Sequence, residues 1–360
     1  MLTGFLGAGK TTLLNRLLAD PALEDAAVII NEFGEIGLDH MFVEGGEEGI
    51  VELASGCLCC TIRGDLVSTL EDLLARREDF SRIVIETTGL ADPAPVLHTI
   101  MLHPALLARI RLDGVIAVVD AVNGAATLLA HKEARKQVAV ADRIVIAKTD
   151  LSPGAGALEE LKARLRDLNP NAPLLDSGAG ADKLLDCGLY NPRTKHPDVA
   201  RWLGEEARAA EEAEEHGGHG HGDHGHVHDV NRHGSIRAFT LQTERLLPIS
   251  AFEGFIDILR SVHGPGLLRV KGIVGIAEFP DTPVVIHGVQ HVFHPPARLN
   301  GWPDGDRRTR IVFITDGIPE ETIRSLFLSL TGEPMVDTPD PAGRFDNPLV
   351  IPGGYKPPEG

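Results

Sequence analysis

Short apolar runs alternate with helical patterns along the first half of the chain. Five runs of four to seven residues are almost continuously apolar, which is typical of strands buried in a parallel sheet: Ala26–Asn31, Arg82–Thr87, Gly114–Asp120, Arg143–Lys148 and Ala172–Leu175. Between them, apolar residues recur at helical spacing near 63–78, 93–109, 125–140 and 155–168. This alternation predicts an α/β fold, a mostly parallel sheet wrapped by helices, over residues 1–203.

The pattern changes between residues 204 and 233, where an acidic, alanine-rich run leads into a segment of His and Gly. Such a composition cannot build a core, so we expect an exposed linker. After it, the pattern predicts strands at Ser235–Thr243, Leu267–Phe279, Val284–His287, Val289–Phe293 and Arg310–Thr315, and helices at Ile249–Val262 and Glu320–Leu330. These elements predict a smaller α+β domain over residues 234–333, followed by a loosely ordered, Pro- and Gly-rich tail, 334–360.

Residues 4–11 form a complete phosphate-binding pattern, G-x-x-x-x-G-K-[ST]. Its glycines let backbone N–H groups turn toward phosphates, and leucines at helical spacing over Thr12–Ala19 predict a helix whose dipole adds to the attraction. Lys10 supplies a charge for the outer phosphates, and the Thr11 hydroxyl is suited to ligate Mg²⁺. The sequence therefore predicts a nucleoside triphosphate site, with the loop candidates Gly4, Gly7, Ala8, Gly9, Lys10 and Thr11.

The strand that feeds this loop should lie near the centre of the sheet. Only Met1–Thr3 precede Gly4, whereas a strand of about five residues is usual. We therefore expect an upstream start codon or a truncated chain.

A second nucleotide signal is the apolar strand Ile83–Thr87, which runs into an E-x-x-G pattern. In GTPases the analogous D-x-x-G places a carboxylate near Mg²⁺ and a glycine N–H near the γ-phosphate. Because the pattern follows a phosphate loop along the chain, we expect Glu86 and Gly89 to take these two positions.

A third signal is Lys148-Thr149-Asp150, which resembles the guanine-reading N-K-x-D pattern. Asp150 would accept hydrogen bonds from guanine N1–H and the 2-amino group, donors that adenine lacks, while Lys148 would lie along the base. Ala147 replaces the usual Asn, and the alternative role of Asp150 is to cap a helix. We expect guanine rather than adenine, with Ser177–Ala179 as a weaker candidate for a backbone contact to the base.

The segment Asn31–Asp39 follows the second strand, where a GTPase keeps a switch that responds to the γ-phosphate. Glu35 is a candidate for positioning water or for binding the transported metal. Glu35 and Asp39 are equally compatible with solvated loop carboxylates.

Three of the chain's four cysteines lie within four residues, as Cys57, Cys59 and Cys60. Thiolates favour Zn²⁺, and so few cysteines indicate a reducing compartment rather than a disulfide framework. Neighbouring side chains diverge in an extended chain, so we expect a bent loop with two or three thiolates and a shell completed by water or a carboxylate. Such an incomplete shell suits transfer of the ion; buried apolar cysteines and a redox pair are the alternatives.

The His and Gly segment contains seven histidines at positions 216, 219, 221, 224, 226, 228 and 233. Neutral imidazoles there would bind Zn²⁺, Ni²⁺ or Co²⁺ loosely, as a reservoir. A solvated linker that happens to be rich in His is the alternative.

The formal net charge of −18 argues against a nucleic-acid partner. No stretch approaches the roughly 18 apolar residues of a membrane span, and the apolar start belongs to the phosphate loop rather than to a signal peptide. We therefore expect a cytoplasmic protein without a membrane or nucleic-acid partner.

Together these segments resemble one family, the CobW-like metallochaperone GTPases, and most closely its YjiA subgroup. The resemblance rests on Thr3–Gly7, Asn31–Gly37, Gly56–Cys60, Glu86–Pro93, Lys148–Asp150 and the His-rich stretch, and it continues into Leu267–Gly272 and His287–Gln290. It covers most of residues 1–333 and implies a P-loop GTPase domain followed by a CobW C-terminal-like domain.

The resemblance implies a slow GTPase that binds Zn²⁺ or Co²⁺ at the cysteines and delivers it to a client metalloprotein, as a monomer or a metal-dependent homo-oligomer. It implies that Gly7, Gly9, Lys10, Thr11 and Thr12 hold phosphate and Mg²⁺, and that Lys148 and Asp150 read guanine. With Glu35 and Glu86, Lys10 completes the expected catalytic set. A P-loop kinase for a small metabolite and a non-catalytic metal buffer are the alternatives.

Overall fold

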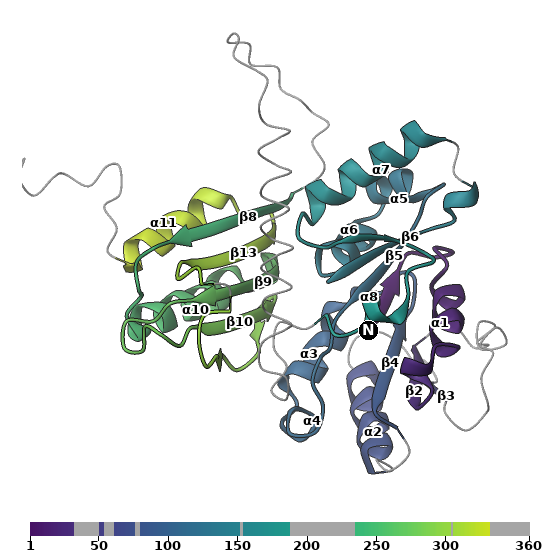
Figure 1. Cartoon of the computed structure of the whole chain (residues 1–360), viewed down its shortest axis with the longest axis horizontal. Helices are drawn as coiled ribbons and strands as arrows, with labels where there is room; N and C mark the ends of the chain where they lie inside the picture. Colours follow the sequence, from purple (N-terminus) through teal and green to yellow (C-terminus); the bar gives the residue numbers. More distant parts are fainter. Residues whose placement is uncertain are drawn as a thin grey trace, which may run out of the picture.

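The computed structural model describes residues 1–31, 50–53, 61–75, 80–151, 154–187, 235–303 and 305–331, which form two sheets with their helices (Figure 1). In the first sheet every strand pairs in parallel, in the order β3-β2-β4-β1-β5-β6-β7. The strands are β1 (Leu2–Gly4), β2 (Ala26–Asn31), β3 (Ile50–Leu53), β4 (Arg82–Thr87), β5 (Ile116–Asp120), β6 (Arg143–Ala147) and β7 (Leu174–Asp176). The predicted parallel α/β class is therefore confirmed.

Helices cover both faces of this sheet. One face carries α1 (Lys10–Leu18), the short 3-10 helix η1 (Pro21–Leu23) and α8 (Ala181–Leu184). The opposite face carries α2 (Thr61–Ala75), α3 (Ala94–Leu102), α4 (Pro104–Leu107), α5 (Gly124–Ala130), α6 (Lys132–Ala139) and α7 (Ala155–Leu168). Within β5, Ile116 and Val118 face the first layer while Ala117 and Val119 face the second, so the strand is buried on both sides.

The strand that leads into the phosphate loop lies in the middle of the sheet, as predicted. Leu2 of β1 is opposite Glu86 of β4 on one side and Ile116 of β5 on the other. Parallel pairing brings the carboxyl ends of these strands to one edge, where an α/β sheet binds its ligands.

The second domain is an antiparallel sheet in the order β11-β10-β9-β13-β8, with β12 paired to β10. Its elements are β8 (Ile236–Thr243), α10 (Ile249–His263), η4 (Gly264–Gly266), β9 (Leu267–Val274), β10 (Val284–Val289), β11 (Val292–Phe293), β12 (Ala297–Arg298), β13 (Thr309–Asp316) and α11 (Glu320–Thr331). Helices α10 and α11 pack on one face through Phe252, Phe255 and Phe327. The predicted α+β domain is therefore confirmed, but its boundaries and the linker fall outside the described residues and stay a prediction.

Two predicted helices are each divided in two. The helix expected over 93–109 stops at Leu102, because Pro104 favours an extended residue before it and His103 has φ −78° and ψ 114°. The helix expected over 125–140 is interrupted at His131, whose extended backbone separates α5 from α6. The His131 ring lies 4.4 Å from the ring of Phe5 in the phosphate loop, a tertiary contact that helical spacing cannot reveal.

The strand predictions were less exact at their ends. The strand expected over Leu267–Phe279 ends at Val274, and the one expected over Val289–Phe293 is the short β11 after a two-residue turn, Gln290-His291. Strands β3 and β12 were not predicted. Among the described helices, none combines the length and apolarity needed to cross a membrane.

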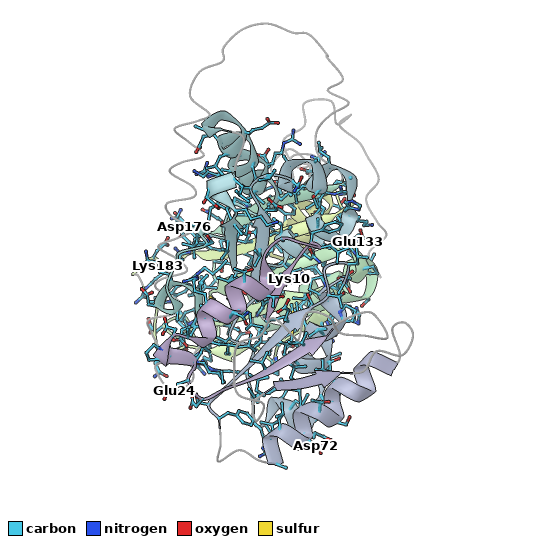
Figure 2. All side chains as sticks on the ribbon, turned by 90° about the vertical axis from the view of Figure 1, so that its right-hand side faces the viewer. Lys10, Glu24, Asp72, Glu133, Asp176 and Lys183 are labelled. Atoms are coloured by element: carbon cyan, nitrogen blue, oxygen red, sulfur yellow. The ribbon has the colours of Figure 1, made fainter. Side chains whose placement is uncertain are left out.

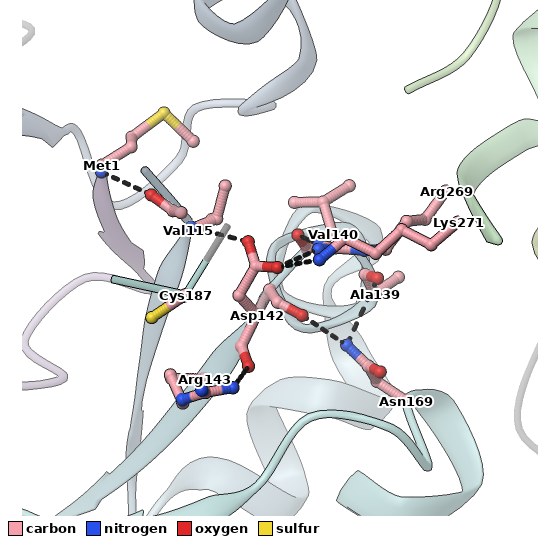
Figure 3. Close-up of polar contacts among 12 residues, drawn as sticks. Met1, Val115, Ala139, Val140, Asp142, Arg143, Asn169, Cys187, Arg269 and Lys271 are labelled. Atoms are coloured by element: carbon pink, nitrogen blue, oxygen red, sulfur yellow. Dashed lines mark hydrogen bonds and ion pairs between the residues drawn. The ribbon is translucent and has the colours of Figure 1, made fainter. Parts of the chain in front are cut away.

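A buried charge cluster joins the two domains (Figure 3). The carboxylate of Asp142, at the start of β6, accepts hydrogen bonds from Arg269 and Lys271 of β9 and from the Val115 backbone N–H, the last at 2.9 Å. Arg269 also donates to the backbone carbonyl of Val140. Arg269, Lys271 and Asp142 are all less than 10% exposed, so each charge depends on the others for its solvation.

The titration of Asp142 reflects this arrangement. Burial alone would raise its pKa, but Arg269 and Lys271 outweigh that effect and hold the pKa well below the ordinary value of 3.8. Burial and the nearby Arg269 lower the pKa of Lys271 to about 8. For a carboxyl group with a depressed pKa, the stabilisation is present above the unfolded pKa and is lost as the pH falls below it.

We predict that Asp142→Asn lowers the stability of the protein by about 3 kcal/mol at pH 7, because it leaves two buried cations without their anion. The difference from wild type should shrink as the pH falls below 3.8, where the native carboxylate loses its advantage. Urea unfolding at pH 7 and pH 3 measures both effects. Asp257→Asn, at a carboxylate 74% exposed on α10, is the control; an equal loss there would contradict the prediction.

Candidate functional site

The phosphate loop connects the end of β1 to the start of α1. Gly9 has a φ of 98°, a left-handed conformation that favours glycine, and it directly precedes the helix. The first turn of α1 therefore offers backbone N–H groups without intrahelical partners, as an anion site requires. The Lys10 ammonium donates to the carbonyl of Phe5 at 3.3 Å, which places it against the loop. Figure 2 shows Lys10 at this end of α1. The other predicted loop residues lie where expected, with Gly4 at the end of β1, Gly7 and Ala8 in the loop, and Thr11 and Thr12 in the first turn of α1.

The second nucleotide signal meets the first one directly. The Thr11 hydroxyl donates to Oε1 of Glu86 at 3.2 Å, although 75 residues separate them in sequence. Glu86 is the last residue but one of its apolar strand and is only 4% exposed. A hydroxyl and a carboxylate oxygen are thus side by side at the mouth of the phosphate loop, which is the donor type that Mg²⁺ prefers.

The E-x-x-G loop packs tightly on the phosphate loop. A Cβ atom added to Gly89 would come within 2.5 Å of the backbone nitrogen of Leu6, so only glycine fits at this approach. On its other side, the Gln137 amide of α6 donates to the carbonyls of Gly89 and Ala91, at 3.2 and 3.0 Å. The loop is therefore held between the phosphate loop and α6.

The end of β5 contributes a carboxylate that the sequence analysis did not single out. Asp120 accepts from Lys148 Nζ at 3.1 Å and from the backbone N–H of Val122 at 2.7 Å. Burial would raise the pKa of Asp120, but hydrogen bonds from Val122, Asn123 and Lys148 outweigh it and lower the pKa. Lys148 has a left-handed φ of 59°, and the ion pair fixes its ammonium beside the phosphate loop.

The predicted base-reading residues lie at the neighbouring strand ends. Asp150 is exposed in the 3-10 turn η3 (Thr149–Leu151), directly after β6. Asp176, the last residue of β7, accepts from the N–H of Gly178 in the loop that follows, at 2.7 Å. Arg16 of α1 donates to the Ala179 carbonyl at 2.6 Å, which ties this loop to the helix that starts at the phosphate loop.

A cavity of about 250 Å³ lies on the α5 and α6 side of the phosphate loop. Its polar lining comes from Asp120, Asn123, Gln137 and Lys148, and the backbone of residues 4–8 closes one side. Lys10, Thr11 and Asp150 do not line it. The cavity therefore adjoins the predicted triphosphate site through Gly4, Gly7 and Ala8, but Lys10 and Thr11 take no part in its lining.

The predicted metal residues Glu35, Cys57, Cys59 and Cys60 and the His-rich segment lie outside the described residues. The described flanks are β3, which ends at Leu53, and α2, which begins at Thr61. Within the described residues, no three His, Cys, Asp or Glu side chains gather as a metal site.

Three residues that bind the site together were not foreseen. Asp120 could have been suspected, since it ends a predicted strand at the carboxyl edge of a parallel sheet. Arg16 and Gln137 carried no such signal, because each lies on a helix and its role depends on which loop the fold brings beside it.

Comparison with known proteins identifies two family domains in the chain. Residues 1–176 match the family described as CobW/HypB/UreG, nucleotide-binding domain, and residues 236–331 match the cobalamin synthesis protein cobW C-terminal domain. The chain is 33% identical to "Zinc chaperone YjiA" of Escherichia coli (strain K12) over 92% of its own length and 97% of that protein. It is 28% identical to "Zinc chaperone CobW" of a Sinorhizobium species, over 92% of this chain and 96% of that one.

Solved structures agree with the sequence comparison. The crystal structure of Zn(II)-bound YjiA GTPase from E. coli covers 91% of this chain and 97% of its own, with a TM-score of 0.63 at 28% identity. Both matched regions correspond to the two sheets described above. The chain therefore belongs to the CobW/HypB/UreG family of nucleotide-binding proteins, with a cobW C-terminal domain.

Proposed function

We propose that this protein is a GTP-hydrolysing metallochaperone that binds Zn²⁺, or Co²⁺, and delivers it to a client metalloprotein in the cytoplasm. The observation that carries the nucleotide half of this proposal is the pairing of Thr11 with Glu86 at 3.2 Å. It brings together a hydroxyl of the phosphate loop and a carboxylate of the E-x-x-G loop, the two kinds of side chain that hold Mg²⁺ in P-loop nucleotide hydrolases.

In the proposed complex, Lys10 and the backbone of Gly7, Ala8 and Gly9 hold the phosphates. Thr11 would ligate Mg²⁺, with Glu86 beside it, and the bound ion would supply positive charge to the γ-phosphate. The backbone N–H of Gly89 is the proposed γ-phosphate contact, and the packing of Gly89 on Leu6 supports it. Glu35 is proposed to position the attacking water.

Guanine recognition is proposed at Asp150 and Lys148. Ala147 stands where an Asn is usual, and its methyl group lies 3.5 Å from where a Cβ of Gly9 would be. Ala147 thus lies next to Gly9 at the base of the phosphate loop, where an Asn would otherwise project. The loop at Ala179, held by Arg16, is the candidate for the backbone contact to the base.

The proposed cargo site consists of Cys57, Cys59 and Cys60, with Glu35 as a candidate fourth ligand. Two relatives that are named zinc chaperones, YjiA and CobW, support Zn²⁺ as cargo. "Zinc-regulated GTPase metalloprotein activator 1" of Schizosaccharomyces pombe, 35% identical over 53% of this chain, supports a client metalloprotein. GTP binding is proposed to draw residues 31–39 toward the γ-phosphate and to shift the cysteine loop; a coupling of about 1.4 kcal/mol would change the metal affinity tenfold.

We predict that Glu86→Gln lowers the rate of GTP hydrolysis about 100-fold, equivalent to about 2.7 kcal/mol, because the charge beside Mg²⁺ is lost. The Mg²⁺ concentration needed for half-maximal hydrolysis should rise as well. Steady-state phosphate release over a Mg²⁺ titration measures both. Glu253→Gln, an exposed residue of α10, is the matched control, and equal rates in the two variants would refute the assignment.

We predict that Asp150→Asn weakens GTP binding about 10- to 100-fold, because the charged acceptor for two guanine donors is lost. The amide supplies a donor instead, so the variant should gain affinity for xanthosine triphosphate, which has a carbonyl in place of the 2-amino group. Competition binding with GTP, ATP and xanthosine triphosphate tests this. Unchanged GTP affinity would show that Asp150 does not bind guanine and has only a structural role in the turn η3.

We predict that Zn²⁺ binds with different affinity in the GDP complex and in the complex with a non-hydrolysable GTP analogue, and that Cys59→Ser removes tight binding in both. Deletion of 216–228 should lower the number of weakly bound ions and leave the tight site intact. Competition with a chromogenic chelator measures both quantities. Equal affinities would exclude gating, and loss of most metal with the deletion alone would indicate a buffer.

A further inference from the structure

Helix α6 holds the E-x-x-G loop at three points. Gln137 donates to the carbonyls of Gly89 and Ala91, and the ammonium of Lys136 lies 2.6 Å from Asp92. Gln137 is 1% exposed. Because both backbone groups within its reach are acceptors, the amide nitrogen must face them, which fixes the orientation of the side chain.

The same helix holds the second domain. Lys132, in its first turn, forms an ion pair with Asp316 of β13 at 3.1 Å. Val140, the residue after its last turn, accepts from Arg269 of β9. The contacts to the second domain therefore lie at the start of this eight-residue helix, Lys132–Ala139, and just after its end, and the contacts to the E-x-x-G loop lie between them.

The helix is also packed against apolar side chains of the second domain. Ala134, Val138 and Ala139 are buried in a cluster that also contains Leu268 and Ile314 of the second domain. Close-packed interiors transmit displacement rather than absorb it. A shift of the Gly89 loop would therefore pass through α6 to β9 and β13.

We propose that α6 couples the nucleotide state to the second domain, with Gln137 as the positioning residue that links the helix to the γ-phosphate-sensing loop. This inference rests on the proposed GTPase function, because the signal is the contact of Gly89 with the γ-phosphate. The coupling is reciprocal. If GTP and GDP stabilise the contact between the domains to different extents, that contact changes the relative affinity for GTP and GDP by the same factor.

The test uses the full-length chain with GDP and with a non-hydrolysable GTP analogue. In wild type, amide hydrogen exchange at residues 267–274 and 309–316 should differ between the two complexes. Gln137→Met keeps the side-chain length but removes the donor. It should lower the preference for the analogue over GDP about tenfold, equivalent to about 1.4 kcal/mol, and abolish the exchange difference.

Lys136→Met, at a partly exposed side chain, and Lys132→Met, at the contact with the second domain, should each reduce the same preference. Lys162→Met on α7 is the control. Lys162 forms an ion pair with Glu159 of the same helix, so its loss should leave the preference unchanged. A preference that is unchanged in Gln137→Met, or an exchange pattern of β9 and β13 that is identical in both wild-type complexes, would overturn the coupling alone. Failure of the wild type to bind either nucleotide would overturn the proposed function with it.

Discussion

The site depends on one constraint, the parallel pairing of β1 between β4 and β5. The register that places Leu2 opposite Glu86 and Ile116 brings Gly4, Thr87 and Asp120 to the same edge of the sheet. The phosphate loop leaves β1 at this edge, and each neighbouring strand delivers a polar group beside it. The hydrogen bond between Thr11 and Glu86 depends on that register.

The first domain does not hold this arrangement alone. Helix α6 lies between the E-x-x-G loop and the antiparallel sheet of the second domain, and Asp142 gathers two cations from that sheet just after α6 ends. The relative position of the domains is therefore set by buried, directional polar contacts in addition to apolar packing. A charge cluster of this kind tolerates few alternative geometries, because any shift leaves a desolvated charge unpaired.

Much of the fold could be predicted because apolar runs and glycine patterns are local signals. The five strand segments, the phosphate loop and its helix needed only neighbouring residues. The two helix breaks differ in how far the sequence predicts them. Pro104 is a local signal for the break at His103, whereas the break at His131 accompanies a tertiary contact between His131 and Phe5. Gln137 and Arg16 could not be predicted, since each acts on a carbonyl more than 40 residues away, and carbonyls are present at every position of the chain. The cysteine motif, by contrast, gives a chemically specific signal in the sequence, but it lies outside the described residues.

The Arg16 bridge has a further consequence. Its guanidinium joins α1, which begins at the phosphate loop, to the loop that follows β7, across 163 residues. Under the proposed function, this one side chain would mechanically link the binding of the nucleobase to the binding of the phosphates. A relative in which this arginine is exchanged would need to stiffen the loop after β7 by other means. Because the acceptor is a backbone carbonyl that any residue at 179 supplies, position 16 is where divergence in nucleotide preference should leave its trace.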